Sequence, residues 1–109
     1  MNPSKDHIHK KSWGPAVWYT LHLYSFLYPE SPTEEDRKNM KNYVLALRKM
    51  IPCKICQINF KRDLLGRTSC PKSPLSLALE SRDKLSRFFV DIHNEINKCN
   101  EKVIVPYAD

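Results

Sequence analysis

The chain has 109 residues, which is enough for one domain but not for two separate hydrophobic cores. Apolar residues make up 41% and charged residues 28% of the sequence, as is ordinary for a soluble domain, and no apolar run is long enough to span a bilayer. The net charge of +6 invites a nucleic-acid-binding role, but we interpret the basic residues as a solvated surface spread along the chain. We therefore expect neither a nucleic-acid nor a membrane partner.

The start of the chain is polar and has no apolar core of the kind that a secretory signal requires. We expect residues 1–12 to form a flexible segment, residues 13–102 a single domain and residues 103–109 a C-terminal tail. Two glycines against eight prolines disfavour β-hairpins and Gly-rich phosphate loops. The prolines lie mainly between apolar-periodic segments, where helices begin and end.

The first half of the chain predicts two helices. Residues 13–28 repeat apolar side chains at helical spacing up to a proline. The next helix begins after Ser31, where Pro32 suits the first helical position and Glu34 completes a capping box. The side chains predicted to face the core are Val17, Leu21, Tyr24 and Tyr28 on the first helix, and Met40, Tyr43, Val44, Leu47 and Ile51 on the second.

The second half predicts two further helices joined by a linker. The third helix begins at a pair of cysteines, and Gly66 suits its C-terminal cap. A short helical turn over residues 75–79 precedes the last helix, which covers residues 82–98. The predicted core residues are Cys53, Cys56, Phe60 and Leu64 on the third helix, and Leu85, Phe88, Phe89, Ile92 and Ile96 on the fourth. We therefore predict an all-α fold, a four-helix bundle with a short additional helical turn, and bundles bind cofactors between facing helices.

The most informative motif is Cys53-x-x-Cys56, which directly follows Pro52. Two intervening residues place both sulfurs on one face of a helix, close enough to form a small disulfide ring. A helix N-terminus stabilises a thiolate, so such pairs are often redox-active. A zinc site is the main rival, because zinc ligands could come from Cys53, Cys56, Cys70 and Cys99, or from three of these with His93. Structural zinc sites generally use two short-spaced pairs, and only one is present here, which makes zinc the weaker interpretation.

Three motifs in order along the chain make it resemble the Erv/ALR family of FAD-dependent sulfhydryl oxidases over roughly residues 13–102. The first is a tryptophan, two residues and Leu-His, followed by the Tyr-Pro that closes the helix. The second is Pro-Cys-x-x-Cys ahead of a phenylalanine-bearing helix, and the third is His-Asn-x-x-Asn in the last helix. The matching residues are Trp18, Leu21, His22, Tyr28 and Pro29, then Pro52, Cys53, Cys56 and Phe60, and finally His93, Asn94 and Asn97.

The resemblance implies a thiol oxidase in which the Cys53–Cys56 disulfide is catalytic. A dithiol protein, such as a thioredoxin-like carrier or a small structural protein, would be attacked at Cys53, and Cys56 would face the flavin. Electrons would pass to FAD and then to dioxygen, giving hydrogen peroxide. A homodimer through the first two helices is also implied. The residues implied to bind FAD are Gly14, Trp18, His22, Cys56, Phe60, Phe88, His93, Asn94, Asn97, Lys98 and Lys102, and no metal is implied.

The chain departs from the family pattern at several positions. Many members have Gly-Arg before the tryptophan of the first helix, whereas this chain has Gly14-Pro15. Many also carry a structural disulfide at the positions of Val90 and Tyr107. Two cysteines, Cys70 and Cys99, have no family counterpart. A disulfide between them is possible, but we favour the alternative in which one of them stays a free thiol or serves as an intermolecular shuttle.

The short chain is most similar to the minimal family members that large DNA viruses encode. A viral member would work in the host cytoplasm or the virion, whereas a cellular one would work in the mitochondrial intermembrane space. The alternative function is a non-catalytic helical interaction module that a disulfide or zinc stabilises. An oxidase would be yellow when purified and would release flavin on denaturation, and a zinc module would be colourless.

Overall fold

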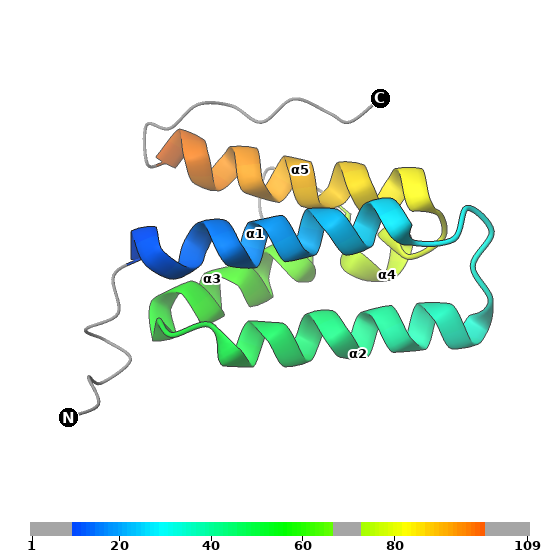
Figure 1. Ribbon diagram of the computed structural model, residues 1–109, viewed down its shortest axis with the longest axis horizontal. Helices are drawn as coiled ribbons and strands as arrows, with labels where there is room; N and C mark the ends of the chain where they lie inside the picture. The colour runs from blue at the N-terminus through cyan, green and yellow to red at the C-terminus, as the bar shows by residue number, and fades with distance from the viewer. Residues whose placement is uncertain (1–9, 67–72, 100–109) are drawn as a thin grey trace.

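The computed structural model describes the backbone of residues 10–66 and 73–99 and forms a helical bundle (Figure 1). The helices are α1 (Lys10–Leu27), α2 (Glu34–Met50), α3 (Lys54–Leu64), α4 (Leu75–Ala78) and α5 (Arg82–Cys99). No strand occurs in these described ranges, which confirms the predicted all-α bundle of four long helices and one short helical turn. No described helix is both long and apolar enough to cross a membrane.

Several predicted residues fall outside what the structure describes. Cys70, Lys102, Tyr107 and the predicted tail lie outside the described backbone. The last turn of α5 is described as a helix, but the side chains of Ile96, Asn97, Lys98 and Cys99 are not. The pairing of Cys70 and Cys99 therefore stays a prediction.

The bundle brings four helix ends together at one end of the molecule. α1 and α5 pack side by side and run in opposite directions, with α2 on the other side of α1 and α3 crossing behind (Figure 1). The starts of α1 and α3 and the ends of α2 and α5 therefore lie at the same end, on the left of Figure 1. The cysteine pair at the start of α3 and the His-Asn motif near the end of α5 both belong to this end.

The core confirms most of the predicted apolar stripes. α5 buries all four of its described stripe residues, and α3 buries Phe60 and Leu64. Burying a side chain of this size contributes about 1.5–3 kcal/mol, so the α5 stripe alone supplies a large share of the stability. The prediction for Tyr24 was wrong: it lies largely exposed on α1, because its ring turns toward Tyr43 on α2, edge-on at a centroid distance of 5.4 Å.

The start of α2 corrects the predicted capping box by two residues. Thr33, not Ser31, is the N-cap, and its hydroxyl accepts a hydrogen bond from the amide of Asp36 at 3.1 Å. The carboxylate of Asp36 accepts one from the amide of Thr33 at 2.9 Å, so this aspartate takes the place predicted for Glu34. The shift keeps three acidic residues in the first turn, where the helix dipole favours them.

Two predicted boundaries also differ at α1 and α3. α1 begins at Lys10 rather than Trp13, so Pro15 lies inside the helix, where its missing N–H removes one helical hydrogen bond. α3 begins at Lys54 and Cys53 is its N-cap, so the first cysteine precedes the helix rather than opening it.

Tyr28 fixes the end of α1 against the other half of the bundle. It is buried, and its hydroxyl donates to the carbonyl oxygen of Leu79 at 2.7 Å, just after α4. Arg82, at the start of α5, donates a second hydrogen bond in this region from its Nε to the carbonyl oxygen of Tyr28. Its Nη1 also forms an ion pair with Glu30 at 3.2 Å. The Tyr-Pro of the first motif thus has a structural role.

Gly66→Ala should lower the free energy of unfolding by about 2 kcal/mol or more, because a left-handed alanine alone costs roughly 1–2 kcal/mol. Gly66 has a φ of 69° and follows α3, and an added Cβ would lie 2.7 Å from backbone atoms of both Ser73 and Pro74. Gly14→Ala is the matched control, because a Cβ there meets nothing within 4 Å and an alanine in a helix should stabilise by about 0.5–1 kcal/mol. Urea denaturation measures both, and equal effects of the two substitutions would contradict this account.

Candidate redox and aromatic site

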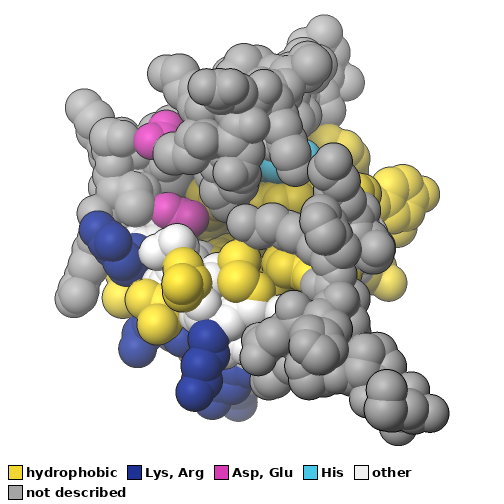
Figure 2. Space-filling model, turned by 90° about the vertical axis from the view of Figure 1, so that its left-hand side faces the viewer, with side chains coloured by type: hydrophobic (Ala, Val, Ile, Leu, Met, Phe, Trp, Pro, Cys, Tyr) yellow, Lys and Arg dark blue, Asp and Glu magenta, His cyan; other side chains and the backbone are white. Residues whose placement is uncertain are grey.

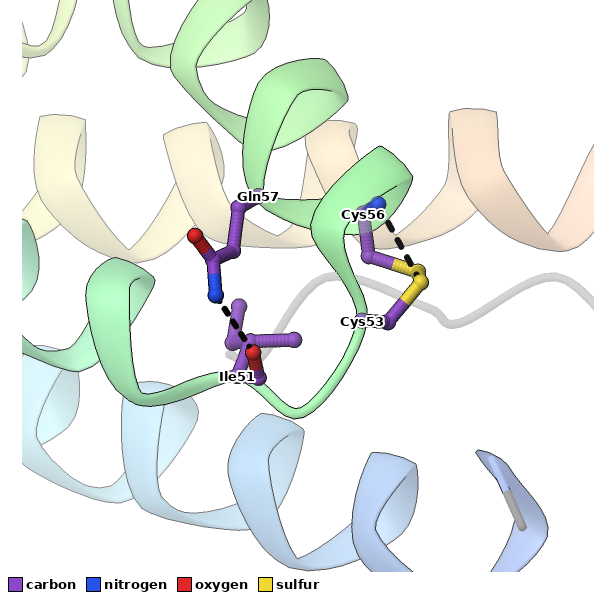
Figure 3. Close-up of a disulfide and its surroundings, with 4 residues drawn as sticks. All are labelled: Ile51, Cys53, Cys56 and Gln57. Atoms are coloured by element: carbon purple, nitrogen blue, oxygen red, sulfur yellow. Dashed lines mark hydrogen bonds between the residues drawn. A yellow bond between two sulfur atoms is a disulfide. The ribbon is translucent and has the colours of Figure 1, made fainter. Parts of the chain in front are cut away.

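The cysteine pair forms a disulfide at the N-terminus of α3 (Figure 3). The Cα atoms of Cys53 and Cys56 are 5.2 Å apart, and both side chains are half-buried. Cys53 has an extended backbone, and its Sγ accepts a hydrogen bond from the amide of Cys56 at 3.2 Å. The sulfur of Cys53 therefore occupies the position where a capping oxygen usually accepts, which is also where the helix best stabilises a thiolate.

Hydrogen bonds from α2 and α3 hold the loop that carries the disulfide. The side-chain amide of Gln57 donates to the carbonyl oxygen of Ile51 at 2.7 Å (Figure 3). It also donates to the carbonyl oxygen of Lys49 at 3.3 Å. Arg48 in turn donates from Nε to the carbonyl oxygen of Gln57 at 3.0 Å. We name Gln57 and Arg48 the loop clamp. Sequence reasoning missed both residues, because neither belongs to a motif and only the fold shows that they face the loop.

A group of stacked rings lies where α1, α3 and α5 meet. The rings of Trp18 and His93 are nearly parallel, 4° apart in orientation, with centroids separated by 4.3 Å. Trp18 also stacks on Phe60 of α3 with centroids 6.1 Å apart, and on His22 at 5.8 Å. Phe26, which was not predicted as a site residue, extends the group by stacking on His22 at 6.2 Å. The three sequence motifs thus come together in one aromatic cluster.

The two motif histidines share a hydrogen bond. Nε2 of His22 lies 3.0 Å from Nδ1 of His93, so one nitrogen donates and the other accepts. This geometry requires at least one neutral ring, and burial lowers the pKa of His22 below its ordinary range, which favours its neutral form. The other ring nitrogen of His22, Nδ1, is buried and has no hydrogen-bond partner among the described residues.

These features fit a flat, polar cofactor such as a flavin nucleotide. A buried ring nitrogen without a partner costs free energy unless a ligand satisfies it, and Nδ1 of His22 is such an atom. The parallel planes of Trp18 and His93 offer the stacking surface that an aromatic ring system needs. The half-buried cysteines pack against the same core cluster as Trp18.

The remaining predicted cofactor residues differ in how the structure places them. Phe88 is buried in the core with its ring edge-on to Phe89, and Asn94 is half-buried on α5 one residue after His93. Gly14 lies near the start of α1 with open space around the position of a Cβ. Asn97, Lys98 and Lys102 have no described side chains, so their roles stay predictions.

A cavity of about 410 Å³ lies elsewhere, between α1 and α2. It contains none of the predicted FAD-binding residues and is lined by Tyr24, Leu27, Tyr28, Pro29, Asp36, Asn39, Met40 and Tyr43. Among the described side chains, no group of three or more His, Cys, Asp or Glu residues could hold a metal ion. The redox pair and the aromatic cluster, rather than this cavity, are therefore the candidate functional site.

Acidification should destabilise the protein through His22. Because burial lowers the pKa of this histidine below 6.5, the unfolded chain binds a proton more readily than the folded one as the pH falls through that value. The free energy of unfolding should therefore be steady above about pH 6.5 and decrease below it. Denaturation curves at several pH values measure this, with His22→Gln as the non-titrating comparison. If the free energy of unfolding decreases equally with falling pH in the wild-type protein and in His22→Gln, His22 is not the group responsible.

Comparisons with known proteins give the same result as this geometry. The sequence pattern of the Erv1 / Alr family matches residues 15–107. FAD-linked sulfhydryl oxidase ERV1 of Arabidopsis thaliana is 28% identical over 91% of this chain, which spans 48% of the plant protein. The FAD-linked sulfhydryl oxidase of African swine fever virus is 26% identical over 89% of this chain, which spans 75% of the viral protein.

The crystal structure of the FAD binding domain of Erv1 from Saccharomyces cerevisiae has the same fold. It matches with a TM-score of 0.74 at 27% identity, covering 92% of this chain and 88% of that domain. A family pattern spanning most of the sequence, a matching solved fold and a disulfide between the two motif cysteines agree with one another. This chain belongs to the Erv1 / Alr family.

Proposed function

We propose that this chain is an FAD-linked sulfhydryl oxidase. Its Cys53–Cys56 disulfide oxidises paired thiols of a protein substrate, and the electron pair passes through FAD to dioxygen, giving hydrogen peroxide. The observation that carries the proposal is the disulfide at the head of α3, packed against the same core cluster as Trp18. The names of the relatives and of the matched domain, all of which include FAD, support it.

The thiol chemistry proceeds by two exchange steps. A substrate thiolate attacks Sγ of Cys53, so a mixed disulfide forms and Cys56 leaves as a thiolate. The second substrate thiolate then attacks the sulfur of the first substrate cysteine, which is bonded to Cys53 in the mixed disulfide. A substrate disulfide forms, and Cys53 leaves as a thiolate. The amide of Cys56, 3.2 Å from Sγ of Cys53, and the N-terminus of α3 stabilise that second leaving thiolate. The substrate loses two electrons and two protons, and the cysteine pair gains the electrons.

The residues of this chain would hold the cofactor and keep the reacting sulfur beside it. When bound, FAD supplies electron transfer from the reduced cysteine pair to dioxygen. Trp18 and His93 would stack on the cofactor, and Nδ1 of His22 would gain its missing hydrogen bond there. Cys56 would face the flavin. Further contacts would come from Gly14, Phe60, Phe88, Asn94, Asn97, Lys98 and Lys102.

We also propose that two copies associate through α1 and α2. Several large apolar side chains of α1 are exposed on the solvent side of the bundle, among them Tyr19, Leu23 and Leu27. The cavity between α1 and α2 lies next to this apolar face, since Leu27 lines it. Covering such a face is the ordinary role of a dimer interface. The mass of the purified protein in solution should be twice that of the chain, and a monomer at micromolar concentration would contradict this proposal.

The substrate would be a thioredoxin-like carrier or a small structural protein with paired cysteines. Relatives include a protein of a large DNA virus and the mitochondrial FAD-linked sulfhydryl oxidase ERV1 of Saccharomyces cerevisiae. A viral member would act in the host cytoplasm or the virion, and a cellular member in the mitochondrial intermembrane space.

The purified protein itself tests the proposed function. It should be yellow, release FAD identified by chromatography when denatured, and consume oxygen on addition of dithiothreitol with one peroxide formed per disulfide. Colourless protein that oxidises no dithiol after incubation with FAD would contradict the proposal and favour a non-catalytic helical module.

A further inference from the structure

The basic residues of the chain are concentrated in one segment, contrary to the even distribution inferred from the sequence as a whole. Residues 37–62 contain eight Lys or Arg and no Asp or Glu, whereas the rest of the chain has ten basic and twelve acidic residues. This segment covers most of α2, the disulfide loop and most of α3. With the four acidic residues at the outer ends of α2 and α3 included, these helices and the loop between them carry eight basic and four acidic residues, which is +4 of the net charge of +6.

Three basic side chains of α2 and α3 are exposed and are not neutralised by the acidic residues described. Lys49, Lys54 and Arg62 are all exposed. The ion pairs found among described residues join Glu30, Glu80 and Asp83 to cations of α5, and none involves these three residues. With no described carboxylate paired to them, these cations can attract an acidic partner to α2 and α3.

Exposed apolar side chains lie beside the same charges. Met50 ends α2 and is 69% exposed, and Ile55, which lies between the two cysteines, is 71% exposed. Ile58 is 57% exposed and follows Ile55 by three residues, so both lie on one face of α3. Figure 2 shows apolar side chains gathered beside Lys and Arg side chains at this end of the molecule. Apolar side chains left exposed next to a reacting group are typical of a surface that a partner covers.

We propose that these residues form a docking surface for a protein segment in which the paired cysteines are flanked by acidic and apolar side chains. The docking surface consists of Lys49, Met50, Lys54, Ile55, Ile58 and Arg62. This inference rests on the proposed oxidase function and adds the class of substrate. Acidic side chains of the segment pair with the cations and raise the association rate, and its apolar side chains cover Ile55 and Ile58. The segment's thiolate is thereby delivered to Cys53, and the exchange follows the balanced steps given above.

Two dithiol peptides of identical length and cysteine spacing test the docking surface. One carries Glu and Leu around its cysteines, and the other carries Lys and Leu. At low ionic strength the wild-type protein should oxidise the acidic peptide with a kcat/KM about tenfold higher than the basic one, within the range that electrostatic steering gives. At about 1 M salt, where charges are screened beyond roughly 3 Å, the ratio should approach one.

A matched pair of double variants locates the effect. Lys49→Glu with Lys54→Glu should abolish the preference for the acidic peptide or reverse it. Lys38→Glu with Lys41→Glu makes the same change in charge on α2, with Lys38 about 16 Å along the helix from Lys49, and should keep most of the preference. Ile55→Ser should lower kcat/KM for the acidic peptide about fivefold compared with the wild-type protein. The same substitution should have little effect on an acidic peptide in which Ser replaces Leu.

The outcomes separate the inference from the function on which it rests. If the wild-type protein oxidises dithiothreitol but treats the two peptides alike at low salt, the docking surface is wrong and the oxidase function stands. If both double variants lose the preference equally, net charge rather than these residues attracts the substrate. If dithiothreitol is not oxidised by flavin-loaded protein, the proposed function itself fails. The wild-type peptide and salt measurements decide the matter even where a variant does not fold.

Discussion

Cys53→Ser and Cys56→Ser should each reduce oxidation of dithiothreitol by about a thousandfold or more, because no exchange with the substrate can be completed with one sulfur of the pair missing. Both substitutions are nearly isosteric, and both side chains are only half-buried. Each variant should therefore keep its helical circular dichroism and its bound flavin. Oxygen consumption gives the rate, and the flavin absorbance of the same samples gives cofactor content.

The two variants should differ in what they trap. Cys56→Ser leaves Cys53 able to form a mixed disulfide with an activated substrate thiol, whereas Cys53→Ser leaves only the sulfur that we place toward the flavin. Mass spectrometry of the protein after reaction with a thionitrobenzoate-labelled peptide distinguishes these adducts by residue. Cys70→Ser and Cys99→Ser are the matched controls and should keep their dithiothreitol activity. Wild-type turnover in either variant of the pair would contradict the mechanism.

Trp18→Ala should weaken FAD binding by about 10- to 100-fold, which corresponds to the roughly 1.5–3 kcal/mol expected for a buried aromatic contact. The reason is the position of Trp18, whose ring contacts rings from three elements and lies 4.3 Å from that of His93. Removing it takes away the stacking surface and leaves Phe60 and His93 without their common neighbour. Titration of flavin-free protein with FAD measures the dissociation constant.

Two controls accompany this measurement. Trp18→Phe keeps an aromatic plane and should recover most of the affinity. Tyr19→Ala removes an aromatic ring from the next residue of the same helix, which is 70% exposed, and should leave FAD binding unchanged. Equal losses from Trp18→Ala and Tyr19→Ala would show that the effect comes from α1 in general. A normal dissociation constant in Trp18→Ala would remove the aromatic cluster from the cofactor site.

The sequence predicted the helices well because their signals are local. The α5 stripe repeats at helical spacing and is buried as expected, and Gly66 has the positive φ that its place after a helix predicted. Tyr24 was mistaken for core because periodicity does not tell which edge of a stripe faces the neighbouring helix. The cap of α2 was misplaced because two overlapping Ser/Thr-x-x-acid patterns occur, and only the backbone geometry selects the second.

The candidate site was predicted as a set of residues but not as an arrangement. The motifs named Trp18, His22, Phe60 and His93, but the contacts between their rings depend on the angles at which α1, α3 and α5 cross. Local sequence patterns do not determine these crossing angles. The loop clamp could not be predicted for the same reason. The charge asymmetry of residues 37–62 was readable from the sequence, but counting charge over the whole chain concealed it.

The loop clamp has a consequence for the catalytic cycle. Gln57 and Arg48 hold the loop through carbonyl oxygens and side-chain nitrogens, so none of their hydrogen bonds involves a sulfur atom. Opening the disulfide therefore leaves the backbone on both sides of Cys53 in place. The two thiols keep a high effective concentration toward each other, and closing the ring again costs little conformational entropy. The protein can thus accept and release an electron pair as a preorganised scaffold, without reorganising its backbone between one substrate and the next.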